Sequence, residues 1–357
     1  MAGKPSRFGV RVTCAGPLSG ADALLRSSVA ADRLGFDTLW VHDYLVWNQL
    51  LDSVHISCGS REAYWDSSAR DDYEPLFMES LTNLAFLAGV TENIRLGLAV
   101  LCLPYREPLA TAKQIANIDV LSNGRLELGV GQGAPLSTHN VEFEVMGMSR
   151  GTKVRRTREM FEAMREVWTK DKASVDGEFY KFQEAEVYPK PVQKPYPPVW
   201  IGGSAEKSLE MIADYADGWL SFWITPEQFP AAIDDIKTRI AERGRDPEAF
   251  TVGTEIQVYL ADTMEQARAD VEPTMLAFEE GYAGTTGHHQ SEEERGDTLT
   301  AIWNSSLVGS PDDVSGQIQA YLDAGCTAFE MKFIYHSVDQ LIEQWTRFQE
   351  EVAPNFA

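Results

Sequence analysis

One stretch of the chain, residues 94–133, constrains the possible folds more than any other. It begins with a run over residues 94–101 that is apolar apart from Arg95 and continues, after Pro108, with apolar side chains at helical spacing. A second run over residues 126–130, apolar apart from Glu127, leads into Gly131-Gln132-Gly133. Continuous apolar runs are typical of parallel strands covered on both faces, and proline is favoured in the first turn of a helix. The pattern therefore predicts a strand, a crossover helix and a second strand, followed by glycines that let a ligand approach the backbone.

The rest of the chain repeats this alternation of strand and helix. Eight predicted strands occupy residues 8–13, 38–41, 94–101, 126–130, 199–201, 218–223, 251–260 and 328–334. Long loops are predicted after the second, fourth and seventh strands, over residues 47–75, 134–150 and 285–297. The alternation predicts an α/β protein, a single (β/α)8 TIM barrel that takes up residues 1–357. An open doubly wound sheet is the alternative, but the first strand lacks the GxGxxG motif of dinucleotide-binding sheets.

Charge and composition narrow the classes of function. The 357 residues carry a net charge of −23, which argues against binding to nucleic acid or to anionic membranes. No apolar run approaches the roughly 20 residues of a membrane helix, and the first residues lack a secretory signal, so a cytoplasmic location is expected. The four cysteines lack metal-ligand spacing, which predicts free thiols. His288-His289 lies among acidic residues typical of a solvated loop, so no metal site is predicted.

Several chemically useful residues lie directly after predicted strands. In a (β/α)8 barrel the carboxyl ends of the strands form one mouth, where active sites lie. His42-Asp43-Tyr44, Gly131-Gln132-Gly133 and Gly202-Gly203-Ser204 follow three different strands, and we expect them to converge there. Because Gly202-Gly203-Ser204 opens a helix, its free N–H groups and the helix dipole favour an anion. An ordinary tight turn before a capped helix would have the same sequence.

Three strings carry a resemblance to a known family. They are GFDTLWVHDYL (35–45), LPYREPLATAKQIANIDVLSNGRLELGVGQG (103–133) and PKPVQKPYPPVWIGGSAEKSLEMIADYADGW (189–219). Over residues 8–219 the chain resembles the bacterial luciferase-like superfamily of flavin oxidoreductases, and within it the branch that uses the deazaflavin coenzyme F420. The resemblance implies hydride transfer between coenzyme F420 and a small, partly apolar organic substrate, and assembly as a homodimer. The alternative that it implies is an FMN-dependent monooxygenase that uses reduced flavin and oxygen.

The resemblance also implies where the cofactor phosphate binds. It places the phosphate on Gly202, Gly203 and Ser204 at the start of the following helix. Relatives that use FMN often carry an arginine for the phosphate near the position of Gln132. The neutral side chain of Gln132 therefore counts against tight FMN binding, although it can bond to the ring edge or the phosphoryl tail.

The cofactor ring is expected on the neighbouring strands. The resemblance places it against Ala99, Val100 and Gly131, and it implies a non-prolyl cis peptide bond between Ala99 and Val100, with Val100 behind the ring. Asp43 is expected to reach the ring or its ribityl chain.

Tyr44 and His42 are the candidates for moving protons above the ring. Tyr44 occupies the position where the superfamily commonly has a catalytic histidine, and its phenol can donate or accept a proton. His42 lies one residue before Asp43, an offset that points to the other face of a strand, so we expect His42 to face away from the mouth. The F420-dependent sugar-phosphate dehydrogenases have a glutamate where this chain has Ala134, which argues against that activity.

Residues near the mouth are candidates for a substrate pocket. They are Trp47, Trp65, His139 and Trp223. Two other classes of function stay open. A barrel hydrolase would need Asp43 and Glu255 as a facing pair of carboxylates. A flavin-binding protein without catalysis would fit the tyrosine in place of the usual histidine.

Overall fold

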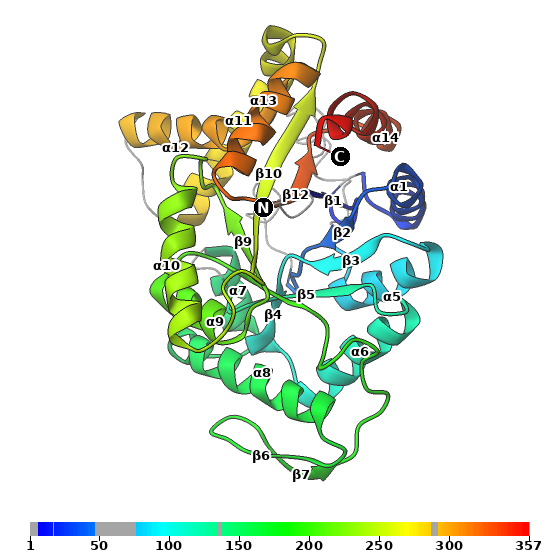
Figure 1. The fold of residues 1–357 in the computed structure, drawn as a ribbon, viewed down its shortest axis with the longest axis vertical. Helices are drawn as coiled ribbons and strands as arrows, with labels where there is room; N and C mark the ends of the chain where they lie inside the picture. Colours follow the sequence, from blue (N-terminus) through cyan, green and yellow to red (C-terminus); the bar gives the residue numbers. More distant parts are fainter. Residues whose placement is uncertain (1–5, 17, 47–75, 134–136, 287–291, 357) are drawn as a thin grey trace.

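A closed ring of parallel strands forms the centre of the molecule (Figure 1). The computed structural model describes residues 6–16, 18–46, 76–133, 137–286 and 292–356. Within these ranges the main sheet has ten strands; β4 and β11 lie beside the ring, and pairing of β10 with β9 closes the others into a barrel. The barrel strands are β1 (Arg7–Arg11), β2 (Thr38–Val41), β3 (Arg95–Leu98), β5 (Leu126–Gly131), β8 (Val199–Gly202), β9 (Gly218–Phe222), β10 (Thr251–Leu260) and β12 (Ala328–Phe333). The eight predicted strands and the (β/α)8 barrel are confirmed.

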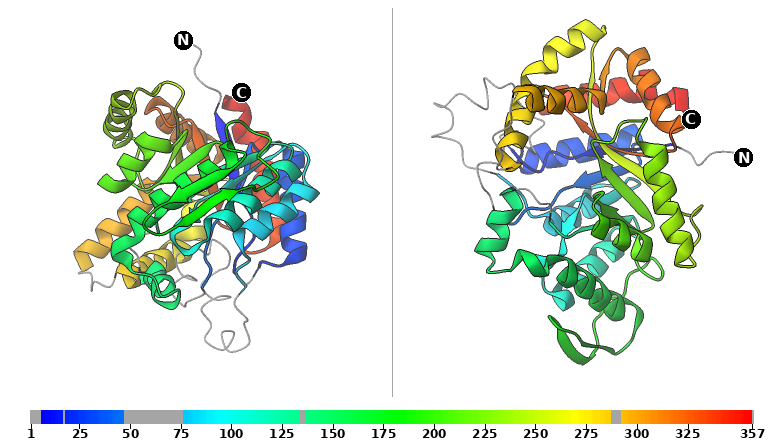
Figure 2. Two further views of the ribbon diagram at one scale, coloured as in Figure 1. Left: turned by 90° about the horizontal axis from the view of Figure 1, so that it is seen from below. Right: turned by 90° about the vertical axis from the view of Figure 1, so that its left-hand side faces the viewer.

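Helices surround the ring on its outer side (Figures 1 and 2). They include α1 (Ala21–Leu34), α5 (Ser80–Val90), α6 (Pro108–Leu121), α8 (Lys153–Thr169), α9 (Glu206–Tyr215), α10 (Phe229–Glu242), α13 (Pro311–Asp323) and α14 (Val338–Arg347). Local sequence explains their limits. Pro108 occupies the first turn of α6, and the Glu107 side chain caps it by accepting the N–H of Ala110 at 2.8 Å. α13 begins with a capping box in which Ser310 and Asp313 bond to each other's backbone N–H.

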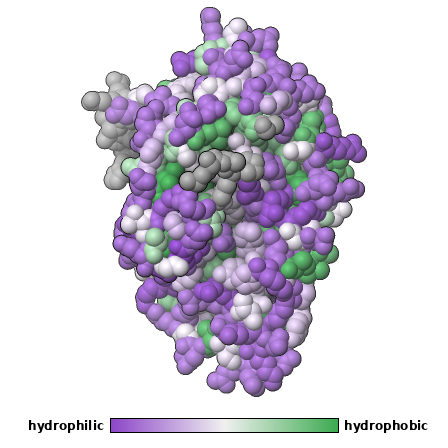
Figure 3. All heavy atoms as spheres, viewed as in Figure 1, coloured by the Kyte–Doolittle hydropathy of each residue, from purple (hydrophilic) through white to green (hydrophobic). Residues whose placement is uncertain are grey.

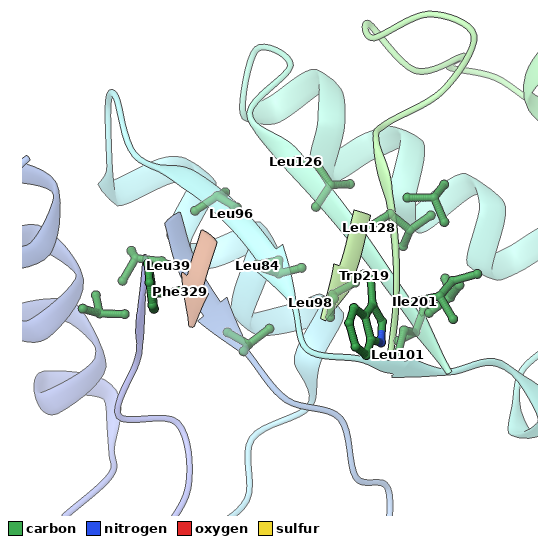
Figure 4. Packing of buried hydrophobic residues seen from close by; sticks show 14 of the residues in the cluster. Leu39, Leu84, Leu96, Leu98, Leu101, Leu126, Leu128, Ile201, Trp219 and Phe329 are labelled. Atoms are coloured by element: carbon green, nitrogen blue, oxygen red, sulfur yellow. The ribbon is translucent and has the colours of Figure 1, made fainter. Parts of the chain in front are cut away.

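The main hydrophobic core lies between the outer face of the barrel and the helices. Leu96 and Leu98 of β3, Leu126 and Leu128 of β5 and Leu84 of α5 are all fully buried in it (Figure 4). Because side chains alternate along a strand, the residues between these leucines point into the barrel.

Two tryptophans fill the inside of the barrel at its middle. Trp40 of β2 and Trp200 of β8 meet edge to face, with ring centroids 5.7 Å apart and planes at 88°. Glycines on neighbouring strands make room for them: a Cβ on Gly9 or Gly97 would overlap the Trp40 ring, and one on Gly218 would lie 2.6 Å from Trp200. The interior is therefore packed, and the mouth above this layer has a solid floor.

Three parts of the fold differ from the sequence predictions. The third strand ends at Leu98, and its continuation is the short strand β4 (Leu101–Cys102). The predicted acidic loop over residues 285–297 is helical at both ends, in α11 (Met264–Thr286) and α12 (Glu292–Asn304). The physical reason is that Ile302 and neighbouring apolar residues of α12 pack on α11. The strand β11 (Ser306–Gly309), which pairs with β10, was not predicted.

Smaller elements complete the described parts of the chain. They are α7 (Ser137–Val145) inside the predicted loop after the fourth strand, the hairpin of β6 (Ala173–Asp176) and β7 (Lys181–Ala185), and the short helical turns η1 (Leu103–Tyr105), η2 (Arg150–Thr152), η3 (Phe348–Val352) and η4 (Ala353–Phe356). The face seen in Figure 3 is largely hydrophilic, with small separate hydrophobic patches. Among the described helices, none has the length and apolar content needed to span a membrane.

Candidate active site

The carboxyl ends of the strands form a mouth on the side away from the amino terminus (Figure 2, right). One half of it, at the ends of β3, β5 and β8, is lined by small residues. The Ala99–Val100 peptide bond is cis, as predicted. Val100 then lies over the glycines of the next strands, since a Cβ on Gly131 would meet Val100 Cγ2 at 2.5 Å and one on Gly202 would meet Cγ1 at 3.8 Å. Ala99 and Val100 are half-buried, so they offer a small, apolar surface to a flat ring.

The predicted anion site lies where β8 passes into α9. Gly203, Ser204 and Ala205 are exposed, and no side chain caps the helix at Ala205. Gly203 has a φ of 94°, a conformation that residues with a Cβ rarely adopt. The indole N–H of Trp219 donates to the Gly203 carbonyl at 3.0 Å and so fixes this turn. The first N–H groups of α9 are thus placed to bind an anion.

Gln132 connects the end of β5 to this helix. Its Nε2 donates to the hydroxyl of Ser208 in α9 at 2.9 Å. Its Oε1 is buried and has no hydrogen-bond partner within the described part of the chain. Buried carbonyl oxygens are rarely left without a donor, so this oxygen suits an N–H or O–H group of a bound molecule. The residues predicted to bind the cofactor from β3, β5 and β8 therefore lie together.

Asp43 does not reach the mouth, contrary to the expectation from the resemblance. Its Oδ1 accepts the Ser80 hydroxyl at 2.7 Å and the Arg106 guanidinium at 2.6 Å. Its Oδ2 accepts the backbone N–H of Cys102 at 3.0 Å. Asp43 thus faces the helix side of β2 and fixes the chain just after the cis peptide bond. It makes no pair with Glu255 across the mouth, so the hydrolase alternative has no carboxylate pair there.

His42 and Tyr44 lie on one side of the chain that leaves β2. Their ring centroids are 6.4 Å apart, and both rings contact Phe77, at 5.0 and 5.4 Å. The prediction that His42 faces away from the mouth while Tyr44 faces it is therefore wrong. The reason is that residues two apart in an extended chain share a face, while Asp43 between them points to the other.

Burial decides the protonation of both side chains, which are 4% and 8% exposed. Burial, together with the positive charges of Arg11 and Lys332, holds the pKa of His42 well below its usual value. Burial, together with neighbouring carboxylates, raises the pKa of Tyr44 well above its usual value. At neutral pH His42 is a neutral imidazole and Tyr44 a neutral phenol.

A cluster of charged residues, the buried Arg11 and Glu330 and the partly exposed Glu255, lies across the mouth from the small-residue half. Arg11 Nε donates to Glu330 Oε1 at 2.7 Å, and Arg11 Nη2 lies 2.9 Å from Glu255 Oε1. Burial raises the pKa of Glu330 to about 8, and Arg11 offsets this only in part. From the sequence only Glu255 was named, as the partner of Asp43 in the hydrolase alternative, and Arg11 and Glu330 were not predicted. The sequence pattern that could have predicted the cluster is the alternation of charged and apolar residues within a buried strand, as in Glu330 and Lys332 of β12.

Aromatic residues at the end of β9 lie between the two halves of the mouth. Phe222 stacks on Trp223 with centroids 4.6 Å apart, and the Trp223 ring meets Phe278 of α11 edge to face at 5.4 Å. Lys332 Nζ lies 5.0 Å from the centre of the Phe278 ring. Phe222 is 41% exposed, so its ring is open to a bound molecule. The predicted pocket residue Trp223 is thus part of an apolar wall.

Three other predicted pocket residues cannot be placed. Trp47 and Trp65 lie outside the described residues, and of His139 the structure describes only its position in α7. Glu142, one helical turn further along α7, was not predicted. Its carboxylate accepts the backbone N–H groups of residues 45 and 46 at 2.6 and 3.0 Å. Through this contact α7 holds the chain that leaves β2.

A closed parallel barrel has small residues at the ends of β3, β5 and β8, an uncapped helix start beside them, and neutral His42 and Tyr44 after the neighbouring strand β2. Such a site suits a barrel oxidoreductase that holds a flavin-type cofactor. The family model for the luciferase-like monooxygenases matches residues 6–328, and the chain belongs to this family.

Known proteins resemble the chain at moderate to low identity. The FMNH2-dependent dimethylsulfone monooxygenase of Pseudomonas putida is 27% identical over 293 residues, which are 77% of this chain and 75% of that protein. The structure of monooxygenase RslO1 from Streptomyces bottropensis has a TM-score of 0.77 at 21% identity and covers 98% of this chain and 100% of its own. An F420-dependent secondary alcohol dehydrogenase has a TM-score of 0.76 at 18% identity, with coverages of 99% and 100%. At these identities the two structural likenesses concern the fold.

Proposed function

We propose that the protein transfers a hydride between coenzyme F420 and a small, partly apolar organic substrate. The observation that carries this proposal is the pairing of the charged side chains at the start of α9, where Glu206 pairs with Arg239 and Lys207 with Glu210. The groups left for an anion there are Ser204, Gln132 and the first N–H groups of α9, which offer hydrogen bonds without a charge of their own. The phosphate of FMN is a monoester with about −1.5 to −2 charge at pH 7. The phosphate of coenzyme F420 is a diester with a single charge. A site of neutral donors favours the group with the smaller charge, because less attraction is needed to offset its loss of water.

The residues at the mouth fit such a cofactor. Ala99, Val100 and Gly131 offer the small, apolar surface for a ring, and the buried Oε1 of Gln132 accepts a hydrogen bond from it or from its side chain. Trp219 fixes the Gly203 turn that meets the phosphate. The bound cofactor supplies the redox chemistry, and the chain supplies position.

The same mouth offers groups for a substrate. The exposed ring of Phe222 and the neighbouring Trp223 give an apolar contact. Tyr44 keeps its proton at neutral pH, so it donates a hydrogen bond or a proton. His42 is neutral and deeply buried, so it acts as support for Tyr44 and the nearby charges.

A second candidate is an FMN-dependent monooxygenase. It is favoured by the name of the relative from Pseudomonas putida, which uses reduced FMN. The same anion site and ring surface would then hold FMN.

Titration of the purified protein with each cofactor tests the two candidates. We expect coenzyme F420 to bind at least about tenfold more tightly than FMN, oxidised or reduced, a difference of about 1.4 kcal/mol. Gln132→Arg should raise the affinity for FMN more than that for F420, because it adds the charge that a monoester needs, whereas Gln132→Met should not. Tighter binding of FMN by the unchanged protein would establish the second candidate, and binding of neither cofactor would refute both.

A further inference from the structure

One carboxylate of the Arg11, Glu255 and Glu330 cluster is accessible from the mouth. The Glu255 side chain is 20% exposed, whereas Arg11 is 6% exposed and Glu330 fully buried. Register places Glu255 of β10 beside Phe222 of β9 on one side and beside Glu330 of β12 on the other. Glu255 therefore adjoins the exposed aromatic ring that forms the apolar wall.

We propose that Glu255 is a further catalytic residue, which contacts a hydroxyl group of the substrate and takes up its proton. Arg11 and Glu330 are positioning residues, which hold the carboxylate from behind. This inference rests on the proposed hydride transfer and names the class of substrate, a neutral hydroxyl compound with an apolar part.

The hydrogen-bond pattern leaves one oxygen of Glu255 for this task. Arg11 Nη2 holds Oε1 at 2.9 Å, and the side chain is 20% exposed, so Oε2 is the oxygen that we assign to the substrate. The neighbouring proton carriers are less suited. Tyr44 keeps its proton because burial and nearby carboxylates raise its pKa, so it is a poor acceptor. His42 is only 4% exposed, which leaves little of its ring for a substrate.

Charge balance around Glu255 explains why a neutral donor fits better than a cation. The titratable groups around it are Arg11 from β1, Glu330 and Lys332 from β12, and Tyr44 from the chain that follows β2. Arg11 already supplies a full positive charge to the carboxylate at contact distance. A cationic substrate would lose its water and meet a carboxylate whose charge Arg11 already balances. A neutral hydroxyl group loses less water and gains a charge-assisted hydrogen bond to the same carboxylate.

The step balances without any further reagent. In the oxidative direction the carbon–hydrogen bond of the carbinol breaks, and its electron pair leaves with the hydrogen as hydride to the oxidised cofactor. The oxygen–hydrogen bond breaks, its proton goes to Glu255 Oε2, and its electron pair forms the second carbon–oxygen bond. A carbonyl compound, the reduced cofactor and protonated Glu255 result. The reverse reaction uses the same groups.

Binding of three small probes tests the contact without any turnover. The probes are phenol, toluene and benzylammonium, measured by quenching of tryptophan fluorescence, with and without coenzyme F420. They share a ring and differ in having a neutral donor, no donor or a cation. We expect the unchanged protein to bind phenol at least about tenfold more tightly than the other two. In Glu255→Gln this preference should fall to threefold or less.

Glu127→Gln is the control, because Glu127 is likewise a glutamate of a barrel strand that pairs with arginine, here Arg7 and Arg95, but it lies at the other end of the barrel. It should keep the preference for phenol. Arg11→Lys should retain more of the preference than Arg11→Met, because lysine still holds the carboxylate from behind. An unchanged preference in Glu255→Gln, or no preference for phenol in the unchanged protein, would overturn the inference.

Turnover gives the second reading. With coenzyme F420 and a panel of cyclic alcohols, Glu255→Gln should lower kcat by about 10²–10⁴, with the affinity for the cofactor unchanged. If F420 does not bind while phenol still depends on Glu255, the proposed cofactor is wrong and the contact stands. If F420 binds and Glu255→Gln changes neither probe binding nor kcat, the proposed function stands and this inference is wrong.

Discussion

Arg11 holds two carboxylates that lie side by side on β10 and β12. Two ionised carboxylates this close repel each other, and one arginine cannot fully offset both when burial also removes water. Glu330, the more deeply buried of the two, keeps its proton up to a pKa of about 8. The site therefore stores a proton next to the more exposed Glu255.

This proton makes the stability of the protein depend on pH in a defined direction. The pKa of Glu330 is higher in the folded chain, about 8, than the ordinary value of 4.5, so folding favours the protonated form. Its contribution is fully present below pH 4.5 and is lost as the pH rises toward 8. Glutamine does not titrate, so Glu330→Gln should not show this decrease in stability. The free energy of unfolding of the variant minus that of the unchanged protein should therefore rise with pH over this range, by up to about 1.4 kcal/mol per pH unit. Urea denaturation at several pH values measures this, and a difference that does not vary with pH would contradict it.

The orientation of single side chains was the least predictable feature. The motif around Asp43 marked the end of β2 correctly, but its side chain bonds to Ser80, Arg106 and Cys102 outside the barrel. Those partners come from segments that begin 37 or more residues later, so no local pattern announces them. By contrast, the shared face of His42 and Tyr44 follows from strand alternation alone.

At the scale of elements, the start of α9 is the part of the site that local sequence predicts best. Where glycines join a buried strand to an amphipathic helix, the first N–H groups of the helix are left free to bind an anion. The cis peptide bond of Ala99–Val100 was also predicted, through the resemblance. α12 was harder to predict, because its first residues are charged and resemble a loop. Its helix is stabilised by packing on α11, a contact that the sequence of α12 alone does not reveal.

A charge placed at the start of α9 should separate phosphate binding from general effects on the fold. Ser204 is exposed and precedes the helix, so Ser204→Asp adds a negative charge with little steric change. We expect the affinity for the phosphorylated cofactor to fall at least about tenfold, or about 1.4 kcal/mol. Ser204→Asn has nearly the same shape without the charge and should bind much more tightly than the aspartate variant. Equal affinities for these two variants would mean that the phosphate binds elsewhere.

At the scale of the whole molecule, the two halves of the mouth depend on a shared floor. Trp40 and Trp200 fill the barrel below the site, and Ala99 packs on this layer from above. In this layer of the barrel, strands that carry a tryptophan have neighbouring strands that carry a glycine. Two indoles therefore fit where branched aliphatic side chains usually fill a barrel. The glycines opposite the tryptophans are therefore part of the packing, and the position of the cofactor surface depends on them.

Replacement of one such glycine tests this dependence. A Cβ on Gly218 would lie 2.6 Å from the Trp200 ring, so Gly218→Ala must displace the indole or the strand. Overpacking of this kind costs about 1–3 kcal/mol of unfolding free energy. Gly316→Ala is the control, because Gly316 lies within α13 and a Cβ there meets no atom within 4 Å. Alanine in a helix interior should instead add about 0.5–1 kcal/mol. Urea denaturation followed by tryptophan fluorescence measures both. If Gly218→Ala were as stable as the unchanged protein, the tryptophan layer would be able to rearrange freely, and it could not be the fixed floor on which the proposed cofactor surface rests.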